Sequence, residues 1–281
     1  MSGALVVVAT PIGNLGDLSP RARGILASAD AIYCEDTRHT RILLSANQIP
    51  GGGRLFALHE HNEASMCGEV LARVERGETV ALVSDAGTPG VSDPGARVIA
   101  AVGAAGLTVT TTPGASAVVA ALSVSGLPME RFVMEGFFPR KGSDQRRRLT
   151  EWAHEERTIV VYESPQRLSA TLNELARAFP DRRGVVVREL TKMHEEIVRG
   201  SLSELAENFA RGDVRGELVV ILEGALARGP ADDATIQRAL GDELARGSST
   251  RDAANQVASA LGASQRHVYE LALGLRRDLR N

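Results

Sequence analysis

The sequence predicts an α/β protein that has two α/β domains and a small C-terminal helical segment of helix-turn-helix type. Three observations lead to this fold class. Short apolar, β-branched runs alternate with amphipathic segments, glycine-rich loops follow several of these runs, and the strand pattern stops after residue 222. A length of 281 residues suits two domains and a small third at ~100–200 residues per domain. The composition, 43% hydrophobic and 24% charged, excludes disordered, collagen-like and coiled-coil proteins.

The first half of the chain has the pattern of repeated βαβ units. Strands are predicted at 5–9, 31–33, 55–58, 79–83 and 107–111, and helices at 63–76, 94–105 and 115–124. The run at 5–9 is continuously apolar, which is typical of a strand buried on both faces. Ser19 and Pro20 have the residue types of an N-cap and a first helical position, so another helix begins there. This alternation predicts a mainly parallel sheet.

The second half begins with a change in composition. Residues 137–148 are polar, basic and rich in turn formers, and we expect an exposed loop or a domain boundary there. Strands at 158–162, 184–188, 196–198 and 217–222 and helices at 166–179 and 203–210 follow. From Gly229 and Pro230 onward only helices are predicted, at 233–245, 251–261 and after Ser264, with Gly262 as a helix stop. The expected domains are therefore 1–137, 138–228 and 229–281.

Charge and cysteine content limit the class of protein. The net charge of −3 excludes a generally basic nucleic-acid binder, so any contact with nucleic acid needs a local basic patch. No stretch has the basic and apolar pattern of a signal peptide or the ~20 apolar residues of a membrane helix. Two cysteines do not make a disulfide framework. We therefore expect a cytoplasmic protein without membrane contact.

Three glycine-rich loops, at 10–17, 84–95 and 112–117, follow predicted strands. In a parallel sheet such loops lie at the carboxyl edge, where ligands of open α/β folds bind, and glycine lets the backbone approach a ligand closely. One such loop could be only a tight turn, but three on one edge favour a shared pocket. None has a phosphate-binding fingerprint, so a nucleoside-type ligand without a polyphosphate fits better than ATP or NAD. Asp85, at a strand end, either binds a ligand amine or hydroxyl or stabilises the turn.

Further polar clusters follow other strands. Residues 34–38 and 163–167 lie either on the rim of a site or at helix starts. A patch of Arg188, Lys192 and Arg199 could hold a phosphate. His59 and His61 would lie on one side of a strand, but no third ligand stands at a supporting spacing, so we expect no metal.

The loops together resemble those of one family. Residues 9–22 (ATPIGNLGDLSPRA), 34–38 (CEDTR), 84–90 (SDAGTPG), 113–117 (PGASA), 162–165 (YESP) and 188–192 (RELTK) occur in this order. The chain resembles the bacterial small-subunit ribosomal RNA cytidine 2′-O-methyltransferases of the tetrapyrrole-methylase superfamily. The resemblance covers about residues 5–222, and that branch also carries a helical tail. Its loop at 11–17 lacks the Gly-x-Gly-x-Gly-Asp pattern of tetrapyrrole-modifying relatives, which argues against a porphyrinoid substrate.

The resemblance implies an enzyme with S-adenosylmethionine (AdoMet) in a cleft between the two α/β domains, usually a homodimer, acting on 16S rRNA in the small ribosomal subunit. The family's cofactor contacts then fall on Gly13, Asp85, Gly87, Thr88, Ser116, Ala117, Tyr162, Gly216 and Glu217. Transfer of a methyl group to a ribose hydroxyl needs no metal, and aligning the reactants supplies at most ~7–11 kcal/mol.

A general base should assist this weak nucleophile. The candidates are Glu35, Asp36 and Glu189, each of which could instead be a structural ion-pair partner. The predicted RNA-binding residues are the basic side chains Arg140, Lys141, Arg146, Arg147, Arg148, Arg188 and Lys192.

Two other functions remain open from the sequence. One is a tetrapyrrole methyltransferase, and the other is a helix-turn-helix regulator that senses a nucleoside. Residues 230–281 carry seven basic and seven acidic residues, and this balance argues against strong DNA binding by the tail.

Overall fold

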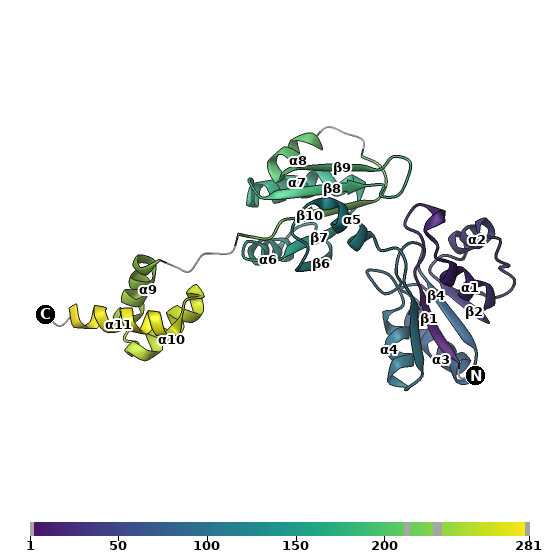
Figure 1. The fold of residues 1–281 in the computed structure, drawn as a ribbon, viewed down its shortest axis with the longest axis horizontal. Coiled ribbons are helices and arrows are strands. Elements are labelled where there is room, and N and C mark those ends of the chain that lie inside the picture. The colour runs from purple at the N-terminus through teal and green to yellow at the C-terminus, as the bar shows by residue number, and fades with distance from the viewer. Residues whose placement is uncertain (1–2, 211–213, 227–231, 279–281) are drawn as a thin grey trace. The chain divides into compact units, whose positions relative to one another are not determined.

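The computed structural model describes residues 3–210, 214–226 and 232–278. Contacts divide the chain into two units, residues 1–225 and 226–281. The first unit contains two five-stranded sheets with helices packed on them (Figure 1). None of the helices within the described ranges is both long and apolar enough to cross a membrane.

The first sheet is entirely parallel, as the βαβ pattern predicts. Its strands are β1 (Ala4–Val8), β2 (Ala31–Cys34), β3 (Leu55–Ala57), β4 (Thr79–Val83) and β5 (Thr108–Thr112), in the order β3-β2-β4-β1-β5. Its helical elements are η1 (Leu15–Asp17), α1 (Pro20–Ser28), α2 (Thr37–Ala46), α3 (Glu63–Glu75) and α4 (Ala96–Ala104). Helices α1 and α2 pack on one face and α3 and α4 on the other. Both faces of the central strands are therefore buried, which explains their uninterrupted apolar sequence.

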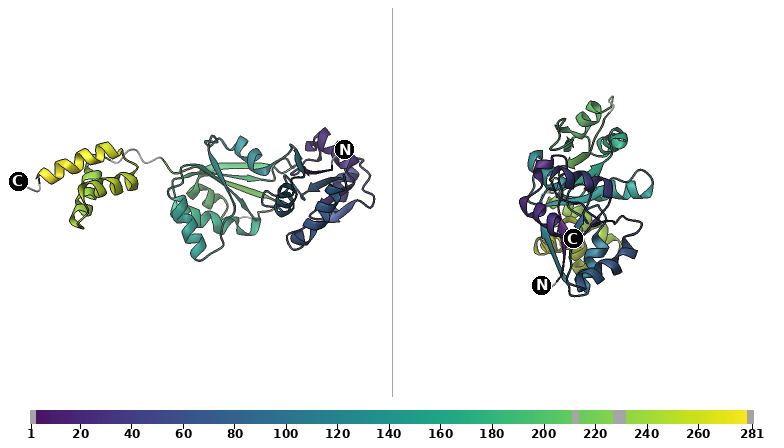
Figure 2. Two further views of the ribbon diagram at one scale, coloured as in Figure 1. Left: turned by 90° about the horizontal axis from the view of Figure 1, so that it is seen from below. Right: turned by 90° about the vertical axis from the view of Figure 1, so that its right-hand side faces the viewer.

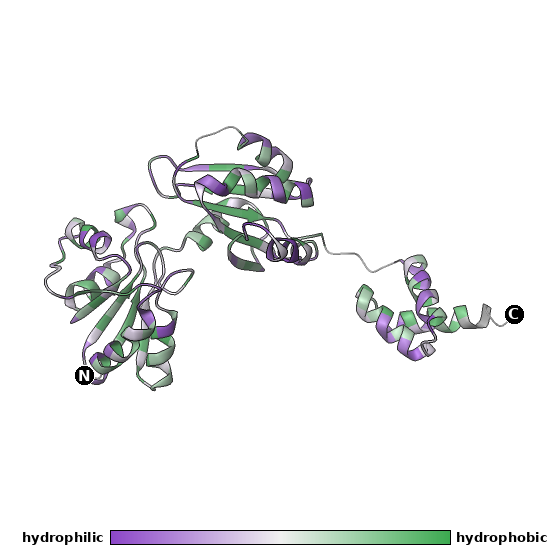
Figure 3. Ribbon diagram, turned by 180° about the vertical axis from the view of Figure 1, so that it is seen from behind, coloured by the Kyte–Doolittle hydropathy of each residue, from purple (hydrophilic) through white to green (hydrophobic). Residues whose placement is uncertain are grey.

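The second sheet is mixed. Its strands are β6 (Phe132–Phe137), β7 (Thr158–Glu163), β8 (Arg183–Arg188), β9 (Glu196–Ser201) and β10 (Leu218–Leu222), in the order β6-β7-β10-β8-β9. Only the β6–β7 pair is parallel. Helix α5 (Ala117–Ser125) packs on one face, and α6 (Ser143–Trp152), α7 (Pro165–Ala178) and α8 (Leu202–Asn208) pack on the other. Figure 3 shows the central strands of both sheets as mostly hydrophobic.

Two expectations for residues 132–148 need correction. Residues 137–148 are not one exposed loop, because α6 begins at Ser143 and is anchored by Trp152, which is 1% exposed. The expected boundary at residue 137 falls at the end of β6, which pairs with β7, and α5 also packs on this second sheet. The chain therefore leaves the first sheet after β5, before the expected boundary.

The second unit is a group of three helices, as predicted. They are α9 (Asp233–Ala245), α10 (Thr250–Leu261) and α11 (Gln265–Asp278), shown at the C-terminal end of the chain in Figure 2. Ile236, Leu240, Val257 and Val268 are among the residues that form a hydrophobic core within this unit. Gly262 ends α10 in the left-handed conformation (φ 61°), as expected of a helix stop. The predicted start of this block, at Gly229 and Pro230, lies outside the described residues.

Candidate active site

The first unit contains a cavity of about 360 Å³ whose walls come from both sheets. The cavity is lined by the 84–95 loop, the start of α5, the ends of β6 and β7, and the segment just before β10. Of the predicted cofactor residues, those that line the cavity are Gly87, Thr88, Ser116, Ala117, Tyr162, Gly216 and Glu217. Gly13 and Asp85 are not among the residues that line it.

The three glycine-rich loops are joined by hydrogen bonds. The backbone N–H of Thr10 donates to Gly87 O at 2.8 Å, and that of Gly87 donates to Thr10 O at 3.1 Å. The Thr88 hydroxyl donates to Ala115 O at 3.2 Å. The loops that the sequence places at one sheet edge therefore form one rim beside the cavity.

Gly13 lies where the first loop meets the loop that follows β8. A β carbon on Gly13 would lie 2.5 Å from Lys192 Cγ and 2.7 Å from Thr191 Oγ1. The N–H of the next residue, Asn14, donates to Thr191 Oγ1 at 3.1 Å. Glycine is therefore required here for a close approach between the two α/β halves.

Asp85 is turned toward the start of α2. Its carboxylate accepts hydrogen bonds from the N–H of Asp36 at 3.0 Å and lies 2.8 Å from Nδ1 of His39. This contact raises the pKa of His39 above its usual range, helped by the negative charge of Asp36 and opposed by Arg38. Asp85 thus positions the α2 start and the 84–95 loop relative to each other.

The His39–Asp85 contact gives a pH-dependent prediction. Asp85→Asn is expected to return the pKa of His39 toward about 6.5, because its main hydrogen-bond acceptor becomes neutral. Since folding raises this pKa, the contact stabilises the native state at low pH and the stabilisation is lost as the pH rises through the native value. NMR titration of the imidazole checks this, with the exposed Asp181→Asn as control. An unchanged titration in Asp85→Asn would contradict the assignment.

The three candidate proton acceptors have different environments, and none of them lines the cavity. Asp36 caps α2 and pairs with Arg38, and this holds its pKa far below the usual range. Glu189 pairs with Lys192 at 2.9 Å and accepts the Glu217 N–H at 2.9 Å, so its pKa is also lowered. Glu35 has a raised pKa, because it is partly buried and lies near the carboxylates of Asp85 and Asp93.

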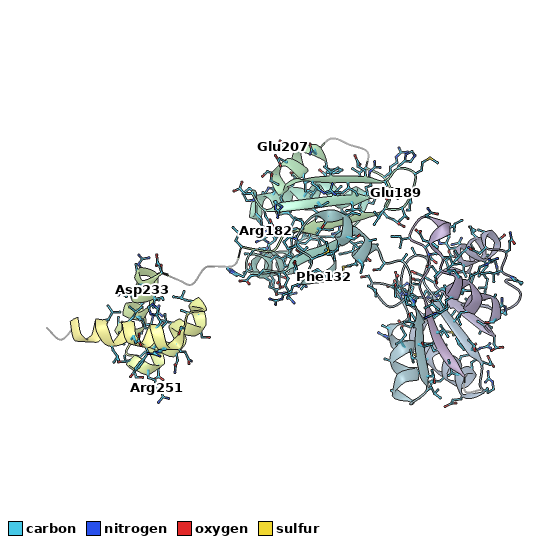
Figure 4. All side chains as sticks on the ribbon, in the orientation of Figure 1. Phe132, Arg182, Glu189, Glu207, Asp233 and Arg251 are labelled. Carbon is cyan, nitrogen blue, oxygen red and sulfur yellow. The ribbon has the colours of Figure 1, made fainter. Side chains whose placement is uncertain are left out.

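The predicted RNA-binding residues separate into free and paired cations. Arg140, Lys141 and Arg146 are exposed and form no ion pair within the part of the chain that the structure describes. The paired ones are Arg147 with Asp144 and Glu151, Arg148 with Glu135 and Glu151, Arg188 with Glu196, and Lys192 with Glu189 and Glu217. Figure 4 shows Glu189 near the end of β8.

Two expectations from the sequence, for Arg199 and for the His59–His61 pair, are wrong. Arg199 does not complete a phosphate patch, because its guanidinium donates to the carbonyl oxygens of Val124 and Ser125 at the end of α5. His59 and His61 do not lie on a strand, since β3 ends at Ala57 and a turn follows. Within the described residues no group of His, Cys, Asp and Glu is arranged to hold a metal ion.

Many residues of the cavity wall are not among the predicted site residues, and Asp93 and Phe137 are two of these. Asp93 belongs to the 84–95 loop. The presence of a second aspartate in the same loop as Asp85 is the sequence feature that could have identified it. Phe137, which the sequence places in a boundary loop, instead ends β6, is 55% exposed and lies beside the Tyr162 ring with centroids 6.0 Å apart. The cavity therefore combines a carboxyl group with two aromatic rings.

Comparison with known proteins identifies the family. The model for tetrapyrrole (corrin/porphyrin) methylases matches residues 4–206. The chain belongs to this methylase family. The methylase is also 45% identical to the ribosomal RNA small subunit methyltransferase I of Mycobacterium tuberculosis (strain CDC 1551 / Oshkosh), over 99% of this chain and 97% of that protein. Its identity to the Xylella fastidiosa (strain Temecula1 / ATCC 700964) protein of the same name is 50%, over 79% of this chain and 82% of the relative.

Solved structures show the same fold for the methylase at low identity. The conserved hypothetical protein APE0931 from Aeropyrum pernix K1 aligns with a TM-score of 0.62 at 19% identity, covering 99% of this chain and 98% of that one. A uroporphyrin-III C-methyl transferase from Thermus thermophilus, complexed with S-adenyl homocysteine, aligns with a TM-score of 0.53 at 21% identity, covering 78% and 96%. The two-sheet architecture is therefore that of the tetrapyrrole methylases.

Proposed function

We propose that this methylase transfers a methyl group from AdoMet to the 2′-hydroxyl of a cytidine in 16S rRNA of the small ribosomal subunit. The observation that carries the proposal is the 45% identity, over nearly the whole length of both chains, to a protein named ribosomal RNA small subunit methyltransferase I. The order of the family motifs supports the ribose hydroxyl as the acceptor.

The cavity suits AdoMet in size and chemistry. About 360 Å³ lies within the usual range of ~300–1,000 Å³ for small-molecule sites. Phe137 and Tyr162 offer aromatic surface for a purine and for a cation, and Asp93 adds a carboxyl group. Ser116 and Ala117 bring the N-terminus of α5 to the wall, where backbone N–H groups favour a carboxylate. When bound, AdoMet supplies a methyl group on a positively charged sulfur.

The residues of the chain have three tasks in such a reaction. The glycine-rich rim and the wall residues Gly87, Thr88, Tyr162 and Gly216 orient the cofactor. The close contact of Gly13 with the loop after β8 holds the first loop against the second α/β half beside the cavity. A carboxylate takes the proton of the acceptor hydroxyl. Of the three candidates from the sequence, Asp36 and Glu189 are held in ion pairs, and Glu35, which has no ion pair among the described residues, does not line the cavity.

The unpaired cations of the 140–146 segment predict where RNA approaches. Replacing Arg140, Lys141 and Arg146 together by alanine is expected to weaken small-subunit binding about 10-fold and to reduce the slope of log affinity against log salt by about 2. These values correspond to the loss of three phosphate contacts, one for each side chain. Filter binding at several salt concentrations measures both values. Alanine at three exposed arginines elsewhere, Arg76, Arg97 and Arg177, is the control, and an equal loss there would contradict a local RNA surface.

We further propose a homodimer in the cytoplasm, in line with the family resemblance and with the absence of a disulfide framework. Both cysteines, Cys34 and Cys67, are free thiols. Sedimentation equilibrium of the full chain tests the dimer.

The function itself is tested with tritiated AdoMet. Small subunits from a strain that lacks the enzyme should become labelled, and nuclease digestion should release a 2′-O-methylcytidine. Label in the base instead of the ribose would overturn the 2′-hydroxyl assignment. Label in a porphyrinoid alone would overturn the RNA substrate.

A further inference from the structure

Asp93 is a carboxyl group of the cavity wall that is not held in an ion pair by the described residues. It is half-buried, lines the cavity, and makes no ion pair with any Lys, Arg or His of residues 3–210, 214–226 and 232–278. The other two acidic residues of the wall are occupied. Glu163 is paired with Arg167, and Glu217 with Lys192.

The usual structural role of an aspartate at this position is filled by another residue. Asp93 lies two residues before Gly95, the N-cap residue of α4. The N–H groups at this helix start are bound by Glu63, whose Oε1 accepts the N–H of Gly95 at 2.9 Å and that of Arg97 at 2.7 Å. The helix start is therefore stabilised without Asp93.

The backbone that presents Asp93 is strained. Ser92, the preceding residue and also part of the wall, has φ 62°, a left-handed conformation that is uncommon for a residue other than glycine. Backbone strain of this kind is concentrated at functional sites. The chain thus holds this carboxyl group in the wall at an energetic cost.

The charges around Asp93 make it a better proton acceptor than an exposed aspartate. Burial and the nearby Asp85 carboxylate raise its pKa, and the adjacent Ser84 hydroxyl lowers it in part. Asp93 also interacts electrostatically with Glu35 and with Tyr162 across the cavity, and it raises the pKa of both. A base is more effective as its pKa approaches the working pH.

We propose that Asp93 is the general base of the methyl transfer, the catalytic residue that accepts the proton of the RNA hydroxyl. This inference rests on the proposed function. As the ribose oxygen forms its bond to the methyl carbon, the carbon–sulfur bond breaks and its electron pair stays on sulfur, which becomes a neutral thioether. The proton of the hydroxyl moves to a carboxylate oxygen of Asp93, so charge and atoms balance without a further reactant.

The test compares Asp93→Asn with the wild-type chain in two assays. Single-turnover methylation of small subunits should be about 10²–10⁴-fold slower in the variant. The decline in rate toward acid pH, which in the wild type reports protonation of the base above the usual aspartate range of about 3.9, should disappear. Calorimetric affinity for AdoMet should stay within about threefold, because asparagine keeps the shape of the side chain. Asp181→Asn, on an exposed turn, is the matched control.

Each other outcome overturns the inference in a distinguishable way. If the variant's rate is within threefold of wild type and still declines toward acid pH, another group takes the proton. A parallel loss of AdoMet affinity shows that Asp93 is a cofactor ligand. A wild-type chain that binds AdoMet but does not label small subunits refutes the proposed function, and the base assignment with it. Asp93→Glu offers a second variant, in which partial recovery of the acid limb is expected only for a proton acceptor.

Discussion

Gly216→Ala is expected to raise the dissociation constant for AdoMet about 10- to 100-fold. Gly216 lines the cavity with φ 90°, a conformation that side chains rarely adopt. A β carbon there would lie 2.3 Å from both Cδ and Oε1 of Glu189. That oxygen holds the Glu217 N–H and the Lys192 ammonium, each at 2.9 Å. The alanine variant must therefore move the wall that we propose to contact the cofactor, and restoring it on binding costs about 1–3 kcal/mol.

Isothermal calorimetry with AdoMet measures this effect, and Gly68→Ala is the control. Gly68 is exposed within α3, and nothing lies within 4 Å of its added β carbon. Alanine there is expected to stabilise the helix by about 0.5–1 kcal/mol and to leave AdoMet affinity unchanged. If Gly216→Ala binds AdoMet as tightly as the wild type, the 216–219 wall is not a cofactor contact.

The parallel first sheet could be predicted because its residues carry a local signal. Strands such as β1 and β4 are buried on both faces, and they are apolar except for Thr79 at the start of β4. Strand β6 was missed because it is an edge strand with a bulge and a left-handed Gly136, and its exposure does not alternate clearly. Helix α6 was missed because its arginines face solvent, and only Leu149 and Trp152 join the core.

The site could be predicted where it depends on loops and could not where it depends on distant pairs. Glycine-rich loops after strands show in sequence, and they meet as expected. The Glu189–Lys192–Glu217 cluster could not be foreseen, because the antiparallel pairing of β8 with β10 brings together residues that are 28 positions apart. The role of Asp36 could not be predicted either, because its position in the sequence is compatible with a helix cap and with a catalytic base. The structure shows that it caps α2 and pairs with Arg38.

Glu163→Ala is expected to destabilise the second sheet and its helices by about 3–5 kcal/mol, the usual cost of removing one partner of a buried ion pair. The Glu163 side chain is fully buried at the end of β7. It pairs with Arg167 at 3.3 Å and accepts hydrogen bonds from the Ser164 N–H at 2.8 Å and the Thr171 hydroxyl at 2.6 Å. Removing the carboxylate leaves a half-buried guanidinium and a buried hydroxyl without this acceptor.

Urea unfolding of the full chain, monitored by tryptophan fluorescence, checks this prediction because it reports on the second sheet and its helices. Trp152 is the only tryptophan, is 1% exposed and packs in the same core as α7, so it reports on the element that Glu163 holds. Glu174→Ala is the matched control on α7, because its exposed pair with Arg177 contributes about 0–1 kcal/mol. Equal effects of the two substitutions would mean that the buried cluster is no more important than a surface ion pair. A larger effect at Glu163 would mean that β7 and α7, and the Tyr162 and Pro165 part of the cavity wall, depend on this one carboxylate.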